Sequence, residues 1–303
     1  MTQDQSAIHI PVLKDEVLEW LQPRPDALYV DGTLGLGGHT QAILERSAPT
    51  GRVVGFEWDE EAAAATGRHL AGFGERVRIV RASYADVVPE LERLGIVEVD
   101  GLVADLGVSS LQLDRAERGF SFRTDNALDM RMDQRRPMTA ATLVAQAAED
   151  QLADIFYHYG EERQARRIAR FIVEARTQAP VDTTGRLAAI VAASVPRKYH
   201  PPKVHVATKV FQALRIAVNG ELDNLSRLLA TAPQILAPGA RICMITFHSL
   251  EDRIVKQAFQ QNPAYAVLSK RPIEPSSEEM RRNPRARSRS EEHTSELQSL
   301  RHL

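Results

Sequence analysis

Four glycines and an acid follow an apolar run near the N-terminus, in the segment Val30-Asp31-Gly32-Thr33-Leu34-Gly35-Leu36-Gly37-Gly38-His39. Glycine has no Cβ and tolerates positive φ, so such a turn brings backbone N–H groups close to a ligand. Residues 27–30 before the turn favour a strand, and residues 39–46 after it favour a helix. A strand, a glycine turn and a helix form the first half of a nucleotide-binding βαβ unit.

The spacing of these glycines argues against two of the three ligand classes that use such a turn. A dinucleotide fingerprint needs glycines at its first, third and sixth positions. Counted from Gly35, the sixth position is Thr40; counted from Gly32, the third is Leu34. A phosphate loop of the Walker type needs a lysine, and none follows Gly38. The remaining pattern, an acid at a strand end followed by spaced glycines, is typical of S-adenosylmethionine-dependent methyltransferases.

Three more strands are predicted further along the chain, over 52–56, 77–80 and 100–104. The polar or aromatic residues that follow them are Glu57, Tyr84 and Asp105. Ligands in open parallel sheets bind beyond the carboxyl ends of the strands, so we expect these three side chains and Asp31 to line one crevice. The Glu57 carboxylate would accept hydrogen bonds from both ribose hydroxyls, and Tyr84 would flank the adenine.

Two of these residues also have a plainer interpretation. A strand-end acid sometimes serves only as a helix cap, a role for which Asp59, two residues beyond Glu57, is also placed. Tyr84 would then be an aromatic at the rim of the site. Four strand ends that deliver such groups to one edge are nevertheless a stronger signal than any one of them.

Nine segments add a resemblance that runs in order across nearly the whole chain. They are Asp31 to His39, Asp105-Leu-Gly-Val-Ser-Ser110, Gln112-Leu-Asp114, Glu117-Arg-Gly-Phe-Ser-Phe122, Leu128-Asp-Met-Arg-Met-Asp133, Tyr159-Gly-Glu-Glu162, Phe211-Gln-Ala213, Phe247-His-Ser-Leu-Glu-Asp-Arg253 and Asn283-Pro-Arg-Ala-Arg-Ser288. Together they resemble the bacterial 16S ribosomal RNA (cytosine-N(4)-)methyltransferase family, also called RsmH or MraW. The resemblance implies methyl transfer from S-adenosyl-L-methionine to the exocyclic amine of a cytidine in the decoding region of the small ribosomal subunit.

The resemblance also implies a cofactor site. By the family pattern its contacts fall on Gly37, Gly38, His39, Glu57, Tyr84, Asp105 and Gln112, to which the turn adds Asp31 and Gly35. Two of these residues depart from the family pattern. The ribose acid is usually aspartate and Glu57 is one methylene longer, whereas the aromatic beside the adenine is often phenylalanine and here is Tyr84. Both changes keep the chemistry but alter the local geometry.

Strand signals vanish between Asp105 and the apolar run at 239–246. Apolar residues at spacings of three and four instead predict helices over 140–148, 150–159, 161–177, 184–194 and 207–218. We therefore predict a doubly wound, Rossmann-like α/β sheet with an inserted all-helical domain that recognises the substrate. The expected bounds are 1–114 and 217–288 for the methyltransferase domain, including a crossover helix over 222–232, and 115–216 for the insertion.

The composition of the chain fits a cytoplasmic enzyme without a membrane partner. Its 303 residues carry a net charge of −2, a single cysteine and no leader pattern or apolar run near eighteen residues. The nine histidines are scattered, so we expect no metal. The sequence is compatible with a monomer or a homodimer.

Basic residues gather locally despite this slightly acidic balance. Five arginines lie between Arg163 and Arg176, and the segment from Pro196 to Lys203 interrupts the helices. Such patches can hold phosphates, and Tyr and His can stack on exposed bases. The predicted contacts to 16S ribosomal RNA are Arg197, Lys198, Tyr199, His200 and Lys203. The alternatives are a structural linker and ordinary solvated helix faces.

The absence of a suitable nucleophile narrows the mechanism. Methylation of a pyrimidine ring carbon generally uses a reactive cysteine, but Cys243 lies in an apolar strand run typical of an inert thiol. An exocyclic amine instead needs its lone pair aimed in line at the methyl group, with acceptors for its hydrogens. Asp105 and the carbonyls of Leu106 and Gly107 are the candidate acceptors, with cofactor anchoring as the other role for Asp105. A related enzyme acting on DNA or protein and a nonenzymatic RNA-binding scaffold are the alternative functions.

Two features near the C-terminus complete the predictions. Ser249 with Asp252 three residues later resembles a capping box, whereas His248 is a second candidate to line the crevice. Residues 289–303 match the translation of a sequencing-adapter oligonucleotide. We interpret them as a non-native tail and expect it to be disordered.

Overall fold

The computed structural model describes residues 11–302 except 270, 284–285 and 287–295. The chain folds as two compact units. One comprises Met1–Ser110 with Asp223–Leu303, and the other comprises Leu111–Leu222. The first unit is therefore built from two segments that are distant in sequence. The domain bounds predicted from the sequence were 114 and 216.

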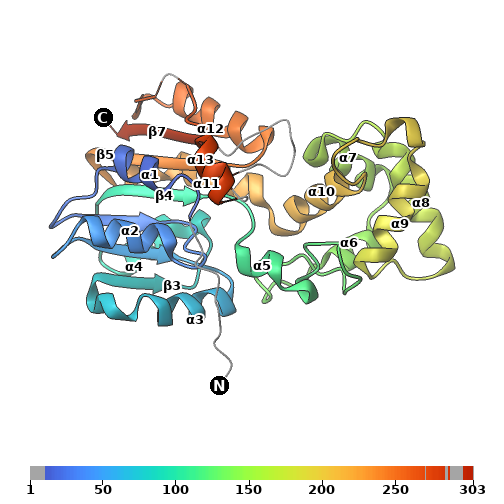
Figure 1. The fold of residues 1–303 in the computed structure, drawn as a ribbon, viewed down its shortest axis with the longest axis horizontal. Helices are drawn as coiled ribbons and strands as arrows, with labels where there is room; N and C mark the ends of the chain where they lie inside the picture. Colours follow the sequence, from blue (N-terminus) through green and yellow to red (C-terminus); the bar gives the residue numbers. More distant parts are fainter. Residues whose placement is uncertain (1–10, 270, 284–285, 287–295, 303) are drawn as a thin grey trace. The chain divides into compact units, whose positions relative to one another are not determined.

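A seven-stranded sheet organises the first unit, in the order β3-β2-β1-β4-β5-β7-β6 (Figure 1). The strands are β1 (Leu28–Asp31), β2 (Arg52–Phe56), β3 (Val77–Val80), β4 (Val99–Asp105), β5 (Leu236–Thr246), β6 (Tyr265–Val267) and β7 (Glu296–His302). The first five are parallel to one another. The prediction of a Rossmann-like α/β sheet is thus confirmed, with the predicted strand ends at one edge.

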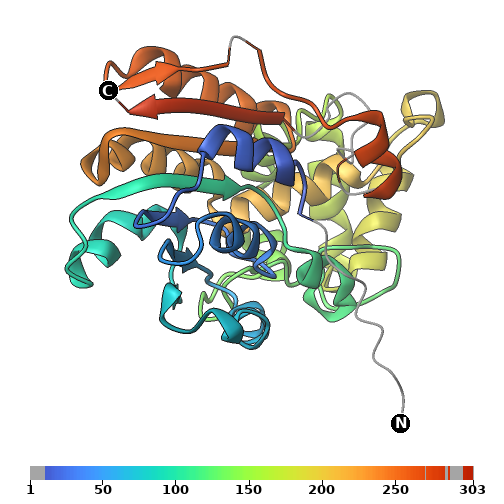
Figure 2. The same cartoon turned by 60° about the vertical axis from the view of Figure 1, so that its left-hand side comes forward.

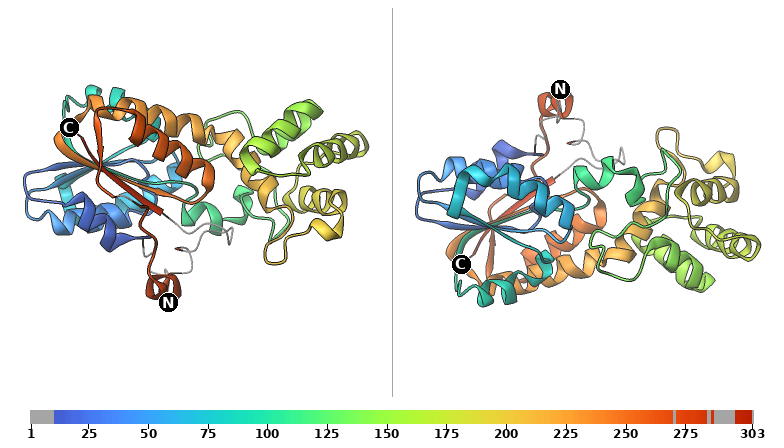
Figure 3. Two further views of the ribbon diagram at one scale, coloured as in Figure 1. Left: turned by 90° about the horizontal axis from the view of Figure 1, so that it is seen from above. Right: turned by 90° about the horizontal axis from the view of Figure 1, so that it is seen from below.

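Both faces of this sheet are buried, which explains why its strands read as continuous apolar runs. Neighbouring residues along β1, Tyr29 and Val30, belong to separate core clusters on opposite faces. The helices of this unit are α1 (Lys14–Leu21), α2 (Gly38–Arg46), α3 (Glu60–His69), α4 (Val87–Arg93), α11 (Glu221–Thr231), α12 (Ser249–Gln261) and α13 (Ser277–Arg282). Short 3-10 helices are η1 (Ala71–Arg76), η2 (Tyr84–Asp86) and η5 (Ala232–Gln234). Figure 3 shows helices on both sides of the sheet seen on edge.

Strand β7 corrects one prediction. Residues 296–302 lie between β5 and β6 and pair antiparallel with both, as Figure 2 shows from the side. The expectation that the whole of 289–303 is disordered is therefore wrong for these residues, because the hydrogen bonds of strand pairing use backbone groups that every residue except proline supplies. Residues 289–295 and 303 lie outside the described part of the chain.

The second unit is helical, as the periodicity predicts. Its helices are α5 (Ser110–Asp114), α6 (Ala140–Gln146), α7 (Glu149–Gly160), α8 (Ala165–Gln178), α9 (Thr184–Ser194) and α10 (Thr208–Asn219), with 3-10 helices η3 (Ala116–Arg118) and η4 (Arg197–Tyr199). Helix α8 starts four residues later than predicted because Glu161 adopts a left-handed φ of 47° that ends α7. Among the described residues, no helix is long and apolar enough to cross a bilayer.

Candidate functional site

Asp31, at the end of β1, holds the two ends of the glycine turn. Its Oδ1 accepts a hydrogen bond from the Thr33 N–H at 3.1 Å, and its Oδ2 accepts one from the Thr40 hydroxyl at 2.7 Å. Burial raises the pKa of Asp31 to about 6, although these hydrogen bonds act to lower it. The carboxylate therefore fixes the path of the backbone from the strand into α2.

Gly37 is required by the conformation of this turn. Its φ of 82° is left-handed, and a Cβ there would lie 2.7 Å from Cγ2 of Thr66 and 3.1 Å from Cδ1 of Leu70. Gly35 also has a positive φ, 51°. Helix α2 begins directly after Gly37, which has no side chain to cap it, and the N–H of Thr40 in its first turn donates to the Asp31 carboxylate. The turn is therefore suited to an anionic or hydrogen-bond-accepting group.

Glu57 links the second strand end to the same turn. Its Oε2 accepts from the Gly35 N–H and its Oε1 accepts from the Asp59 N–H, both at 2.9 Å. Burial raises the pKa of Glu57 to about 8, and the nearby charges of Asp59 and Asp31 add to the effect. Asp59, not Glu57, caps α3, accepting from the next N–H groups through Oδ1. Contact of Glu57 with a ribose stays a prediction.

Asp105 ends β4 and carries a buried oxygen that lacks a partner. Its N–H donates to the Thr33 hydroxyl at 2.6 Å, which ties β4 to the glycine turn. Oδ2 lies 3.8 Å from Nε2 of His39, whereas Oδ1 is buried without a hydrogen bond from any residue that the structure describes. Burial raises the pKa of this carboxyl to about 8, with contributions from Asp31 and Glu251. An orphaned buried acceptor is costly and marks a place for a ligand's donor.

Tyr84 is buried rather than exposed at a rim. Only 9% of the residue is accessible, and it packs within the core cluster on one face of the sheet. Its ring centroid lies 6.2 Å from that of Trp58, and a Cβ on Gly32 would approach its Cβ to 3.2 Å. The small Gly32 therefore allows Tyr84 to lie against the start of the turn. Contact with an adenine stays a prediction.

The cap of α12 differs from the predicted one. His248 is the N-cap, with its Nδ1 accepting from the Glu251 N–H at 3.3 Å. The capping-box interpretation of Ser249 and Asp252 is wrong because the extended backbone of His248 already places the imidazole over the helix end, and Asp252 pairs with Lys256 instead. His248 is buried, and its Nε2 lies 3.2 Å from Oε1 of Glu251.

Predicted site residues are distributed over both units. Those in the first unit are Asp31, Gly35, Gly37, Gly38, His39, Glu57, Tyr84 and Asp105. Gln112 is buried on α5 of the second unit. Sequence reasoning missed Thr33, Thr40 and Glu251, whose hydrogen bonds or charges act on the strand-end acids. Only the closeness of Thr33 and Thr40 to Asp31 in the chain could have indicated them.

The predicted RNA-contact segment lies in the second unit. Tyr199 is 53% exposed, and Nζ of Lys198 lies 4.9 Å from the centre of its ring. Arg197 and Lys203 are also exposed, whereas Nε2 of His200 is 3.0 Å from the Val195 carbonyl. His200 therefore holds the segment's own backbone.

Comparison with known proteins gives one family. The model of the MraW methylase family matches residues 6–291. A ribosomal RNA small subunit methyltransferase H from Desulfotalea psychrophila is 56% identical over 285 residues, covering 94% of this chain and 97% of that protein. Its namesake from Symbiobacterium thermophilum is 46% identical over 92% of this chain and 94% of its own length. A solved structure of a putative rRNA-methylase from Clostridium thermocellum aligns with a TM-score of 0.46 at 11% identity, covering 96% and 95% of the two chains.

Proposed function

The chain belongs to the MraW methylase family, and on that premise we propose that it methylates the exocyclic N(4) amine of a cytidine in 16S ribosomal RNA. It is a methyltransferase that uses S-adenosylmethionine. The names of its relatives, ribosomal RNA small subunit methyltransferases, support the substrate. We place the cytidine in the decoding region of the small subunit and the enzyme in the cytoplasm, where that substrate is found.

One observation carries this proposal: three carboxylates at separate strand ends, those of Asp31 and Glu57 buried and that of Asp105 partly buried, are linked through one glycine turn. Asp31 and Glu57 both accept from backbone N–H groups of the turn, and the Asp105 N–H donates to Thr33 within it. Burial raises the pKa of each carboxyl. Buried acids of this kind favour a ligand with positive charge and many donors. S-adenosylmethionine fits, with its sulfonium, its amino group and its ribose hydroxyls.

The residues proposed to hold the cofactor are Asp31, Gly35, Gly37, Gly38, His39, Glu57, Tyr84, Asp105 and Gln112. When bound, the cofactor supplies an electrophilic methyl group. The carboxylate of Glu57 would accept from the ribose, since each oxygen that accepts one backbone N–H retains a second lone pair. The glycine turn would place backbone N–H groups against the cofactor without side-chain interference.

We propose direct in-line transfer without a covalent enzyme intermediate. Cys243, the single cysteine, is fully buried in β5, which argues against a role as nucleophile. Asp105 Oδ1 would accept a hydrogen from the target amine and thereby orient its lone pair. The carbonyls of Leu106 and Gly107 are further candidate acceptors, and Gly107 adopts a left-handed φ of 94° just beyond the strand end. Anchoring of the cofactor is the other role open to Asp105.

The proposed contacts to the ribosomal RNA are Arg197, Lys198, Tyr199, His200 and Lys203. Exposed cations would pair with phosphates, and the exposed Tyr199 ring would stack on a base. His200, whose ring contacts the Val195 carbonyl, would act by shaping the segment. We propose that the enzyme works as a monomer or a homodimer.

Methyl transfer from labelled S-adenosylmethionine to small ribosomal subunits that lack the modification tests the proposal. Nucleoside analysis should find the label on the cytidine N(4) amine, and Asp105→Ala should abolish transfer. Separate measurement of cofactor affinity distinguishes anchoring from amine binding by Asp105. Label on another nucleoside, on DNA or on protein would overturn the assigned substrate, and full turnover by Asp105→Ala would remove Asp105 from the site.

A further inference from the structure

A long stretch of the helical unit carries only positive formal charge. Residues 183–220 contain no aspartate or glutamate and six lysines or arginines. Two of those cations make contacts within the protein: Arg215 pairs with Glu221 at 2.8 Å, and Arg186 donates to the Ala179 carbonyl at 3.2 Å. Arg197 and Lys198, on η4, are exposed. The loop after α9 therefore presents exposed cations at Arg197 and Lys198.

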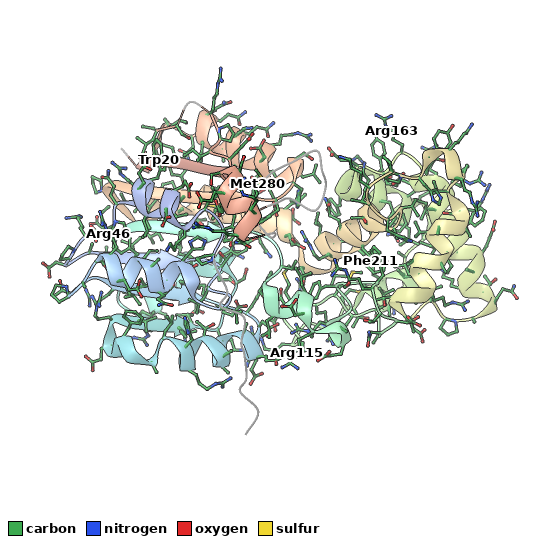
Figure 4. The ribbon with its side chains drawn as sticks, in the orientation of Figure 1. Trp20, Arg46, Arg115, Arg163, Phe211 and Met280 are labelled. Carbon is green, nitrogen blue, oxygen red and sulfur yellow. The ribbon has the colours of Figure 1, made fainter. Side chains whose placement is uncertain are left out.

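Helix α8 has a second set of exposed cations on its outer face. Ile168 and Ile172 are fully buried, whereas Arg166, Arg167 and Arg170 are exposed. Positions 166 and 170 are one turn apart and lie on the same side of the helix. Arg163, just before the helix, is also exposed, and Figure 4 shows it at the surface of this unit.

A hydrogen bond from α8 to the end of α9 brings these two sets close together. Nε of Arg167 donates to the carbonyl of Ser194 at 2.5 Å, and Ser194 is the last residue of α9, three residues before Arg197. The Arg167 guanidinium also lies 5.4 Å from the ring centre of Phe171, with that of Arg170 at 6.0 Å. Phe171 therefore lies close to both guanidinium groups, and the outer face of α8 adjoins the start of the η4 segment.

The arginines between Arg163 and Arg176 fall into two groups. Some make hydrogen bonds that hold the fold, and others do not. Arg176 donates to the carbonyls of Val144 and Ala147, and Arg167 holds Ser194. By contrast, Arg163 and Arg166 make no side-chain hydrogen bond or ion pair with any residue in the described ranges. Arg170 approaches Glu174 at 3.7 Å, with both side chains more than half exposed. Such an exposed pair is weak and gives way to a stronger anion.

We propose that Arg163, just before α8, and Arg166 and Arg170 of α8 form, with η4, one continuous surface that binds phosphates of the substrate RNA. The proposal rests on the proposed function and extends it, since it adds a helix face to the η4 contacts. Guanidinium groups pair with phosphate through two parallel N–H donors. An exposed tyrosine beside them suits a base that has left its stack. Arg167 is a positioning residue, because its contact with Ser194 keeps the two parts of the surface together.

The test measures binding to undermethylated small ribosomal subunits and to naked 16S ribosomal RNA. The double variant Arg166→Gln/Arg170→Gln should weaken both by roughly tenfold and lower the salt slope by about two. KM for subunits should rise in parallel, with cofactor affinity unchanged. Glu174→Gln should do the reverse and tighten binding, because it removes the anion that competes for Arg170. Arg46→Gln, which removes an exposed arginine from α2, is the matched control.

Three outcomes decide the matter. If the double variant binds as tightly as the parent, with an unchanged salt slope, the α8 face does not contact RNA. If affinity falls for intact subunits but not for naked RNA, the face binds a protein of the subunit and the phosphate assignment is wrong. Both results leave the proposed function standing when the parent enzyme labels cytidine N(4); failure of the parent to label that amine instead refutes the proposed function itself.

Discussion

Nε2 of His39, in the first turn of α2, lies 3.8 Å from Oδ2 of Asp105 at the end of β4. His39 directly follows the glycine turn and is buried, whereas the Asp105 side chain, from another strand, is 23% exposed. The pKa of Asp105 is nevertheless raised to about 8, first by burial and then by the charges of Asp31 and Glu251. The carboxyl therefore carries a proton at neutral pH until a ligand supplies donors or positive charge.

Cofactor affinity should consequently rise with pH. A cationic ligand favours the ionised form of Asp105, so binding releases a proton below pH 8 and no longer does so above it. Calorimetric titration should show affinity increasing by up to about tenfold per pH unit between pH 6 and 8, then levelling. Asp105→Asn corrects for titration of the cofactor itself, since its own profile should lack this component. Identical pH profiles for the two proteins would show that Asp105 does not titrate on binding.

The stability of the ligand-free protein should respond to pH in the opposite sense. Because the folded pKa of Asp105 lies above its ordinary value of 3.8, its contribution to stability is complete below about pH 4 and is lost as the pH rises to about 8. Asp105→Asn, which cannot ionise, should therefore gain in Tm relative to the parent between those pH values. Thermal unfolding across this range measures the difference. Asp150→Asn, at an exposed position, should show no such trend.

Gly37→Ala should damage the turn. The substituted residue would need a left-handed φ of 82° with its Cβ 2.7 Å from Thr66 Cγ2, at a cost of about 1–3 kcal/mol. We expect a lower free energy of unfolding in denaturant titrations and weaker cofactor binding. Gly72→Ala is the matched control, because no atom lies within 4 Å of its Cβ position. Equal losses from both substitutions would contradict a specific role for the turn.

Asn219→Ala should destabilise the helical unit. Oδ1 of Asn219 accepts from the Met132 N–H, and Nδ2 donates to the Met130 carbonyl, both at 2.8 Å and both buried. Removing the amide leaves two buried backbone groups without partners, at about 2–4 kcal/mol. Hydrogen exchange should show faster exchange at Met132, whereas Gln178→Ala, at an exposed position, should leave it unchanged. Retained protection of this amide would refute the assigned role.

Much of the fold follows from local patterns. The strands that end at Asp31, Phe56 and Asp105 are where apolar runs place them, and the helices of the insertion follow from apolar spacing. These predictions succeed because each depends on residues that are neighbours along the chain. Their convergence at one edge follows from the rule for parallel sheets.

Contacts between distant residues could not be predicted in this way. The hydrogen bond from the Asp105 N–H to Thr33 joins residues 72 positions apart, and Arg167 reaches Ser194 across 27. The predicted cap of α12 was also wrong, because His248, one position before the expected serine, is the N-cap. Pairing of 296–302 with β5 depends on backbone geometry rather than side-chain type. In each case the contact depends on the three-dimensional fold and not on residues that are neighbours in the sequence.

The long sequence separation between β4 and its neighbour β5 affects the order in which the two units fold during synthesis. Although these strands pair in register from Gly101 with Arg241 to Asp105 with Ile245, the last residue of β4 precedes the first of β5, Leu236, by 131 positions. A ribosome that adds about 5–20 residues per second needs about 7 to 26 seconds to make that stretch. Throughout this interval, the nascent β4 has an unpaired edge while the helical unit emerges complete. The helical unit can therefore fold first, whereas the sheet of the first unit is completed only after β5 has been synthesised.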